Sequence, residues 1–186
     1  MSNIVNYMYW KWDSALSPEF CHSALQEINW ATAEVATINQ ENIPADPSRR
    51  VTDIIWQSPM QPLGCIARTY IEAANNSAGW GFLLNGQEDT QLSRYKSENK
   101  GHYDWHMDAF PPKDGVQRKL SCVILLNVPS EFEGGELQLK TSEGENLLTK
   151  QGSIIVFPSF MEHKVTPVTK GVRYTAVTWA IGPSFK

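Results

Sequence analysis

The stretch Gly101-His-Tyr103-Asp-Trp-His106-Met-Asp108 contains an imidazole and a carboxylate two residues apart. On a β-strand, His106 and Asp108 leave the same face, about 6–7 Å apart along the chain, because side chains alternate with a period of two. An imidazole and a carboxylate at this spacing can bind one metal ion. A second imidazole from another strand would complete a 2-His-1-carboxylate facial triad, which leaves coordination positions open for a cosubstrate and O2.

His163 is the candidate for the second imidazole, and Arg173 follows it ten residues later. The segment Thr169-Lys-Gly171 is typical of a turn, which predicts that residues 163–167 and 172–181 form a hairpin. Arg173 would then lie roughly 10 Å from His163, an interval that fits a five-carbon dicarboxylic acid. A guanidinium suits the far carboxylate of such an acid, because it can bind it bidentately and stays charged when buried.

Short strands rich in β-branched and aromatic residues are predicted over the second half of the chain. We expect them at residues 80–84, 91–95, 103–110, 119–127, 136–139, 153–157, 163–167 and 172–181. Several short strands at this spacing favour an antiparallel sandwich or jelly roll. The predicted fold class is therefore mainly β, with flanking N-terminal helices on the outer face of one sheet.

Two helices are predicted before these strands. Ser17-Pro18 is typical of an N-cap followed by proline at the first helical position. The second helix is indicated by Ser58-Pro59 and by apolar residues at helical spacing between positions 63 and 74.

The length of 186 residues predicts a single domain over residues 1–186. Within it we expect a helical support region at residues 1–79 and a β-core at residues 80–186. The hydrophobic content of 41% and the charged content of 19% are those of an ordinary globular protein.

Charge and cysteine content narrow the environment and the partners. The formal net charge of −4 argues against non-specific binding to nucleic acid or anionic membranes. The sequence has neither a long apolar run nor a signal-peptide pattern, so no membrane association is expected. Cys21, Cys65 and Cys122 are odd in number and far apart. We therefore expect reduced, buried thiols and a cytoplasmic location.

The segment 95–183 resembles the 2-oxoglutarate/Fe(II)-dependent dioxygenase superfamily, specifically its prolyl 4-hydroxylase-like (PKHD-type) branch. The resemblance is carried by Tyr95 and by residues 101–108, 120–127, 132–137, 152–158, 163–173 and 178–179. A lone HxD motif is a weak signal, but these motifs are specific in combination. The resemblance implies a double-stranded β-helix (jelly roll, cupin-like) in which His106, Asp108 and His163 are the metal ligands and catalytic residues.

The same resemblance implies a reaction and its cofactors. Arg173 matches the basic residue that binds the far carboxylate of 2-oxoglutarate, and Tyr95 and Tyr103 match tyrosines that line the cosubstrate or substrate pocket. Fe(II), 2-oxoglutarate and O2 would be required, with ascorbate as the reductant. The favoured reaction is 4-hydroxylation of a peptidyl proline with release of succinate and CO2, so the expected partner is a proline-containing peptide or protein.

Two positions differ from related branches. Leu125 replaces a second 2-oxoglutarate-binding tyrosine of some prolyl hydroxylases, and Trp179 replaces a second arginine of the nucleic-acid demethylases, which speaks against a nucleic-acid partner. Hydroxylation of another residue type or of a free amino acid is left open, as is a non-catalytic cupin-like metal-binding domain. Arg173 favours the enzyme, because a domain that only binds a metal has no need of it. The sequence leaves the oligomeric state and the physiological substrate open.

Overall fold

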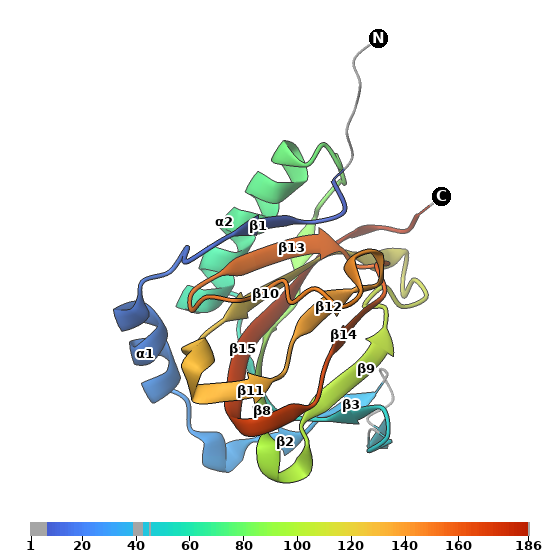
Figure 1. Cartoon of the computed structure of the whole chain (residues 1–186). Coiled ribbons are helices and arrows are strands. Elements are labelled where there is room, and N and C mark those ends of the chain that lie inside the picture. Colours follow the sequence, from blue (N-terminus) through green and yellow to red (C-terminus); the bar gives the residue numbers. More distant parts are fainter. Residues whose placement is uncertain (1–6, 39–42, 45, 186) are drawn as a thin grey trace.

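The long strand β15 (Val168–Pro183) lies in the middle of the protein's large sheet. It pairs antiparallel with β10, β8, β7 and β11, so it contacts more strands than any other element among the described residues. The computed structural model describes residues 7–38, 43–44 and 46–185. Figure 1 shows the helices on one side of this sheet and a smaller sheet on the other, which makes three layers.

The strands of the two main sheets come from both halves of the chain. The large sheet has the order β1 (Trp10–Trp12), β13 (Ile154–Pro158), β10 (Val116–Leu125), β15, β8 (Thr90–Lys96), β6 (Asp53–Gln57) and β2 (Glu34–Val35), with β7 (Gly86–Gln87) and β11 (Phe132–Gly134) paired to β15. The small sheet has the order β12 (Leu137–Leu139), β14 (His163–Val165), β9 (His102–His106) and β5 (Arg50–Val51). The predicted fold class, a mainly β double-stranded β-helix with flanking helices, is confirmed.

The remaining regular elements are helices and one small ribbon. The α-helices are α1 (Pro18–Gln26) and α2 (Pro62–Ser77), and β3 (Thr37–Ile38) pairs with β4 (Ile43–Pro44). Single turns of 3-10 helix occur at Trp30–Thr32, Ser97–Asn99, Pro129–Glu131 and Lys140–Ser142. None of the helices in the described part of the chain is long and apolar enough to cross a membrane.

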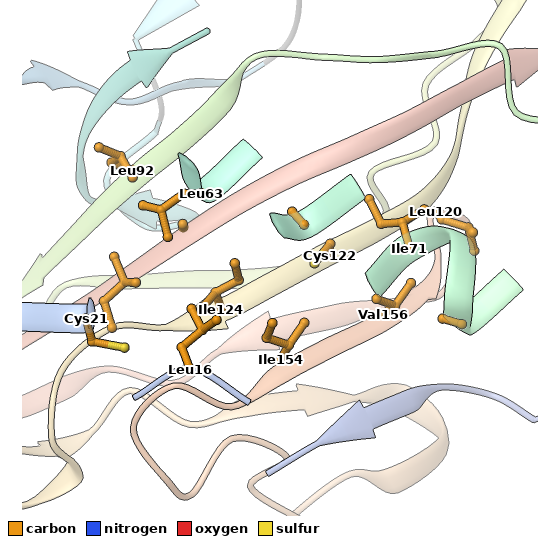
Figure 2. Close-up of a cluster of buried hydrophobic side chains, with 14 of the residues drawn as sticks. Leu16, Cys21, Leu63, Ile71, Leu92, Leu120, Cys122, Ile124, Ile154 and Val156 are labelled. Atoms are coloured by element: carbon orange, nitrogen blue, oxygen red, sulfur yellow. The ribbon is translucent and has the colours of Figure 1, made fainter. Parts of the chain in front are cut away.

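Helix α2 packs its apolar stripe onto the back of the large sheet. Leu63, Ala67, Ile71 and Ala74 recur at helical spacing and are buried. Figure 2 shows Leu63 and Ile71 in one cluster with side chains from the sheet strands. Removing a buried side chain of this size typically costs about 2–5 kcal/mol, so this layer contributes substantially to the stability of the sheet.

Helix α1 begins as the sequence predicts. The Oγ atom of Ser17 accepts a hydrogen bond from the backbone N–H of Phe20, and Pro18 occupies the first turn. Helix α2 begins at Pro62 rather than at Ser58-Pro59, because the Ser58 hydroxyl accepts from the N–H of Met60 and closes a turn there instead.

Alternate side chains of strand β15 point to opposite faces of the large sheet, so the strand lies between two apolar cores. Ala176 and Ala180 face the cluster beneath the helices, whereas Arg173, Val177 and Trp179 face the space between the two sheets. A second core cluster, which includes Leu125, fills much of that space. One strand therefore supports the hydrophobic layer behind it and the polar cavity in front of it.

The predicted hairpin between residues 163–167 and 172–181 is wrong. Strand β14 pairs on its two edges with β12 and β9 in the small sheet, so no edge is left for β15. The chain instead crosses to the large sheet after β14, as expected where a jelly roll turns from one sheet to the other. Residues 169–171, interpreted as the hairpin turn, lie within β15.

Three other predictions are corrected. Residues 80–84 form no strand, and the strand predicted at 103–110 ends at His106, so Asp108 lies beyond it. Cys65 is exposed, although Cys21 and Cys122 are buried as expected, and all three thiols are free.

The expected helical support region, residues 1–79, also contains strands that join both sheets. Strand β1 pairs with β13, β6 pairs with β8, and β5 pairs with β9. These strands have two to five residues. Segments this short are difficult to detect from alternation, and tertiary pairing decides them.

A comparison of alanine substitutions at Gly171 and Gly115 tests how closely β15 approaches the Glu131 carbonyl. Gly171 has φ +67°, and a Cβ there would overlap the carbonyl oxygen of Glu131, whereas Gly115 has φ +76° with open space around it. Gly115→Ala should cost about 1–2 kcal/mol for the left-handed backbone alone. Gly171→Ala should cost at least about 1–3 kcal/mol more, because overpacking is added. Chemical denaturation of both variants measures the difference, and equal losses of unfolding free energy would contradict the close approach.

Candidate active site

A cavity of about 510 Å³ lies between the two sheets. All six residues that the sequence singles out line it: Tyr95, Tyr103, His106, Asp108, His163 and Arg173. They come from both sheets and from the segment after β9. Polar side chains that converge in one cavity with apolar and aromatic ones are typical of a small-molecule site.

Two histidines face each other across neighbouring strands of the small sheet. His106 ends β9, His163 begins β14, and the two are register partners with ring centroids 4.1 Å apart. The carboxylate of Asp108 completes the group, with Oδ1 3.7 Å from Nε2 of His106 and Oδ2 3.4 Å from Nε2 of His163. One ligand atom from each residue can be chosen so that all lie within 4.8 Å of one another.

Backbone hydrogen bonds determine which nitrogen of each imidazole faces the carboxylate. Nδ1 of His106 lies 2.8 Å from the carbonyl oxygen of Asp104, and Nδ1 of His163 lies 2.9 Å from that of Met161. A carbonyl only accepts, so in the neutral rings both Nδ1 atoms carry the proton and both Nε2 atoms present lone pairs.

This donor set fits a divalent metal ion. Two imidazole lone pairs and a carboxylate directed at one point repel one another unless a cation lies among them. Two nitrogens and one oxygen on one face are the ligands of non-haem Fe(II) sites, and Nδ1–H bonds to carbonyls are the usual support of metal-bound histidines.

The protonation states suit metal binding. Burial lowers the pKa of His106 to about 3, and the neighbouring His163 acts in the same direction. Burial acts to raise the pKa of Asp108, but the neighbouring His163, His106 and Arg118 outweigh it and lower this pKa to about 2. A neutral imidazole and an ionised carboxylate are the forms that coordinate metals.

Arg173 brings a positive charge to the same cavity. It is 2% exposed, and its Nη2 atom has no hydrogen-bond partner among the described residues. Burial lowers the pKa of Arg173 to about 10, so the group is still charged at neutral pH. A buried cation with an unused donor is costly unless an anion binds it, and a carboxylate matches its planar fork. Gly135 lets the chain approach, since a Cβ there would lie 2.7 Å from Cδ of Arg173.

The two tyrosines flank these charged groups. Tyr95 is the register partner of Arg173, whose Cζ lies 5.5 Å from its ring centroid. Tyr103 stacks on His106, with ring centroids 3.4 Å apart at 11°, and Arg50 covers its other face. Burial raises the pKa of Tyr103, so its phenol keeps its proton.

The structure brings further residues to this region that no sequence pattern marks. Trp56 and Arg118 approach Trp179 from two other strands, with a 6.2 Å separation of the tryptophan centroids and a 3.7 Å distance from the guanidinium to the Trp179 ring. Ser121 donates a hydrogen bond to Asp108. No local pattern marks these residues, because sheet pairing alone brings their strands together. Leu125, the position at which the resemblance predicts a missing second tyrosine, is fully buried in the inter-sheet core.

Comparison with known sequences places this geometry in a family. A model of the 2OG-Fe(II) oxygenase superfamily matches residues 90–181. A PKHD-type hydroxylase of Synechococcus sp. is 41% identical over 65 residues, which cover 34% of this chain but only 29% of that relative. A PKHD-type hydroxylase of Aliarcobacter butzleri is 29% identical over 167 residues, which cover 86% of this chain and 70% of that relative.

Solved structures share the fold. A viral collagen prolyl hydroxylase from Paramecium bursaria Chlorella virus-1, in complex with 2OG, aligns with a TM-score of 0.74 at 22% identity over 97% of this chain and 99% of that one. A Pseudomonas putida prolyl-4-hydroxylase aligns with a TM-score of 0.69 at 20% identity over 96% and 94%. A Trichoplax adhaerens prolyl hydroxylase in complex with a peptide fragment of hypoxia inducible factor aligns with a TM-score of 0.67 at 18% identity over 93% and 83%. These likenesses show the fold, and the family match shows that residues 90–181 belong to the 2OG-Fe(II) oxygenase superfamily.

Proposed function

We propose that this protein is an Fe(II)- and 2-oxoglutarate-dependent hydroxylase that acts on prolyl residues of a peptide or protein. The observation that carries the proposal is the buried guanidinium of Arg173, which has an unused donor in the cavity that also holds His106, Asp108 and His163. The three candidate ligands alone would suit any metal-binding domain. A buried cation with an unused donor in the same space favours an anionic cosubstrate.

Each residue has a defined task in this proposal. His106 and His163 offer neutral Nε2 atoms to the metal, and Asp108 offers its carboxylate. Arg173 binds the far carboxylate of 2-oxoglutarate and thereby orients the keto acid end toward the metal. Bound iron supplies the O2 chemistry that oxidatively decarboxylates 2-oxoglutarate to succinate and CO2 and hydroxylates the substrate.

The choice of a prolyl substrate is supported by the relatives and by the cavity. The similar solved proteins are prolyl hydroxylases, and one of them contains a bound peptide. Here, Trp56 and Trp179 line the cavity. The Arg118 guanidinium covers the Trp179 ring, so the exposed face of Trp56 is the one that suits a pyrrolidine ring. We also propose ascorbate as the reductant and the cytoplasm as the location, in keeping with the three free thiols.

Succinate formation tests the reaction and the substrate together. With Fe(II), 2-oxoglutarate and ascorbate, the protein should release succinate slowly, and proline-containing peptides should accelerate this release. Mass spectrometry should then locate one added oxygen on proline. Acceleration by a free amino acid but by no peptide would overturn the prolyl assignment, and absence of succinate in every arm would overturn the enzymatic one.

Arg173 is the proposed anchor for the far carboxylate of 2-oxoglutarate, so its substitution should weaken cosubstrate binding without weakening metal binding. Arg173→Met should raise the 2-oxoglutarate concentration needed for half-maximal succinate formation by at least about tenfold, since a charged hydrogen bond contributes about 1.5–3 kcal/mol. Co(II) affinity should stay within about threefold, because Arg173 is no ligand. Without ligands, the variant should be as stable as the unmodified protein or more so, since an unpaired buried charge is removed.

Arg94→Met is the matched control on the neighbouring strand. Arg94 donates two hydrogen bonds to Asp53, at 3.0 and 2.7 Å, and does not line the cavity. This variant should lose thermal stability yet keep the 2-oxoglutarate requirement. An unchanged requirement in Arg173→Met would refute the anchor assignment.

Metal titration tests the proposed ligands independently of turnover. His163→Ala should weaken Co(II) binding by more than about 100-fold, since a direct ligand is lost and outer-shell losses alone cost about 10–100-fold. His102→Ala is the control, because His102 belongs to the same strand as His106 but contacts the carbonyls of Lys100 and Ser48. Equal Co(II) affinity in both variants, measured by calorimetry, would contradict the triad.

A further inference from the structure

The carboxylate of the candidate metal site is held differently from its two histidines. His106 and His163 lie on paired strands of the small sheet, whereas Asp108 lies beyond the end of β9. The backbone N–H groups of Asp108 and Ala109 both donate to the carbonyl oxygen of Ser159, each at 2.9 Å. Strand pairing therefore sets the positions of the two imidazoles, whereas hydrogen bonds outside the strands set the position of the carboxylate.

Two buried serine hydroxyls add further hydrogen bonds that hold the Asp108 carboxylate. Oγ of Ser121 donates to Oδ2 of Asp108 at 2.7 Å, and Oγ of Ser159 lies 3.0 Å from Oγ of Ser121. Both serines are 0% exposed, so bulk water does not compete for these bonds. Charged acceptors strengthen such hydrogen bonds, and a low local dielectric strengthens them further.

The direction of the chain of hydrogen bonds follows from proton counting. An ionised carboxylate only accepts, so the single hydroxyl proton of Ser121 is directed at Asp108. The bond between the two serines must then be donated by Ser159. The order is Ser159 to Ser121 to Asp108, which occupies one acceptor position of Oδ2 and restrains rotation of the carboxylate.

The two serines also tie this carboxylate to the large sheet. Ser121 is in β10, where it is the register partner of Phe157 in β13 and of Trp179 in β15. Ser159 directly follows β13, and its N–H donates to the carbonyl of Lys119 at 2.9 Å. The large sheet thus supports the carboxylate, while the small sheet carries the imidazoles.

We infer that Ser121 and Ser159 are positioning residues that set the orientation of Asp108 toward a metal held between the two sheets. This inference rests on the proposed function. It goes beyond that function by assigning a role to two residues that contact neither cosubstrate nor substrate in the proposal. If the hydroxyls merely satisfied each other in the core, their loss would change stability but not metal binding.

Ser121→Ala measures the effect directly. Co(II) affinity of the purified protein should fall about 10–100-fold, the usual range for a lost outer-shell partner. The visible absorption spectrum of bound Co(II) should also change, because the carboxylate is free to reorient. Ser121→Thr should restore both, since it keeps the hydroxyl. The 2-oxoglutarate requirement, measured at saturating metal, should stay within about twofold because Arg173 is untouched.

Ser159→Ala gives a second, milder variant. It keeps the backbone carbonyl that accepts from Asp108 and Ala109, and it removes only the donor to Ser121. Its loss of Co(II) affinity should be smaller than that of Ser121→Ala. This ordering tests the proposed direction. If Ser121→Ala fails to fold, unchanged affinity and spectrum of bound Co(II) in Ser159→Ala overturn the inference.

Ser153→Ala is the matched control for a buried hydroxyl. Ser153 is also 0% exposed, but its Oγ accepts from the N–H of Ser14 at 3.1 Å, and the residue does not line the cavity. This variant should lose stability and keep the affinity and spectrum of bound Co(II). Unchanged affinity and spectrum in Ser121→Ala would overturn the inference and leave the proposed function intact. Failure of the unmodified protein to bind metal would overturn the proposed function itself.

Discussion

The closing of two β-sheets on one another is the constraint on which the rest of this structure depends. The small sheet presents His106 and His163 side by side, and the large sheet presents Arg173 and the serine support of Asp108. Neither sheet alone brings a carboxylate to the two imidazoles. The apolar cluster between the sheets, which includes Leu125, therefore has a second effect besides stability, because it sets the separation at which these polar groups meet.

Strand β15 connects this packing to the charge in the cavity. One face of β15 packs on the apolar cluster under helix α2, and the other face carries Arg173, which is almost fully buried, into the cavity. An ion in such a place interacts strongly with any partner, since the effective dielectric is low. The same burial makes the unused Nη2 donor of Arg173 costly, so binding of an anion there would stabilise the protein.

The sequence predicted much of the fold and several of the residues that line the cavity. The β-rich second half, the Ser17 cap and the apolar stripe of α2 follow from local patterns, and the structure confirms them. Spacing and chemistry indicated four of the candidate residues, the resemblance to a known family added Tyr95 and Tyr103, and the structure brings all six to one cavity. The errors that bear on the site concern connectivity: the hairpin before Arg173, the strand extended to Asp108, and the short strands of the first half of the chain. Each depends on which strand supplies a pairing edge, and a local pattern carries no information about that.

The sequence by itself determined the kinds of groups available, two imidazoles, a carboxylate and a guanidinium in a fixed order, because residue identity fixes charge, donor atoms and metal preference. It also determined the strand-forming and helix-forming segments, since alternation and capping act over a few residues. Only the tertiary structure decided that Asp108 is supported by Ser121 and Ser159 and that Trp56 and Arg118 gather around Trp179. These contacts join residues far apart in the chain, and their geometry exists only once the two sheets have packed.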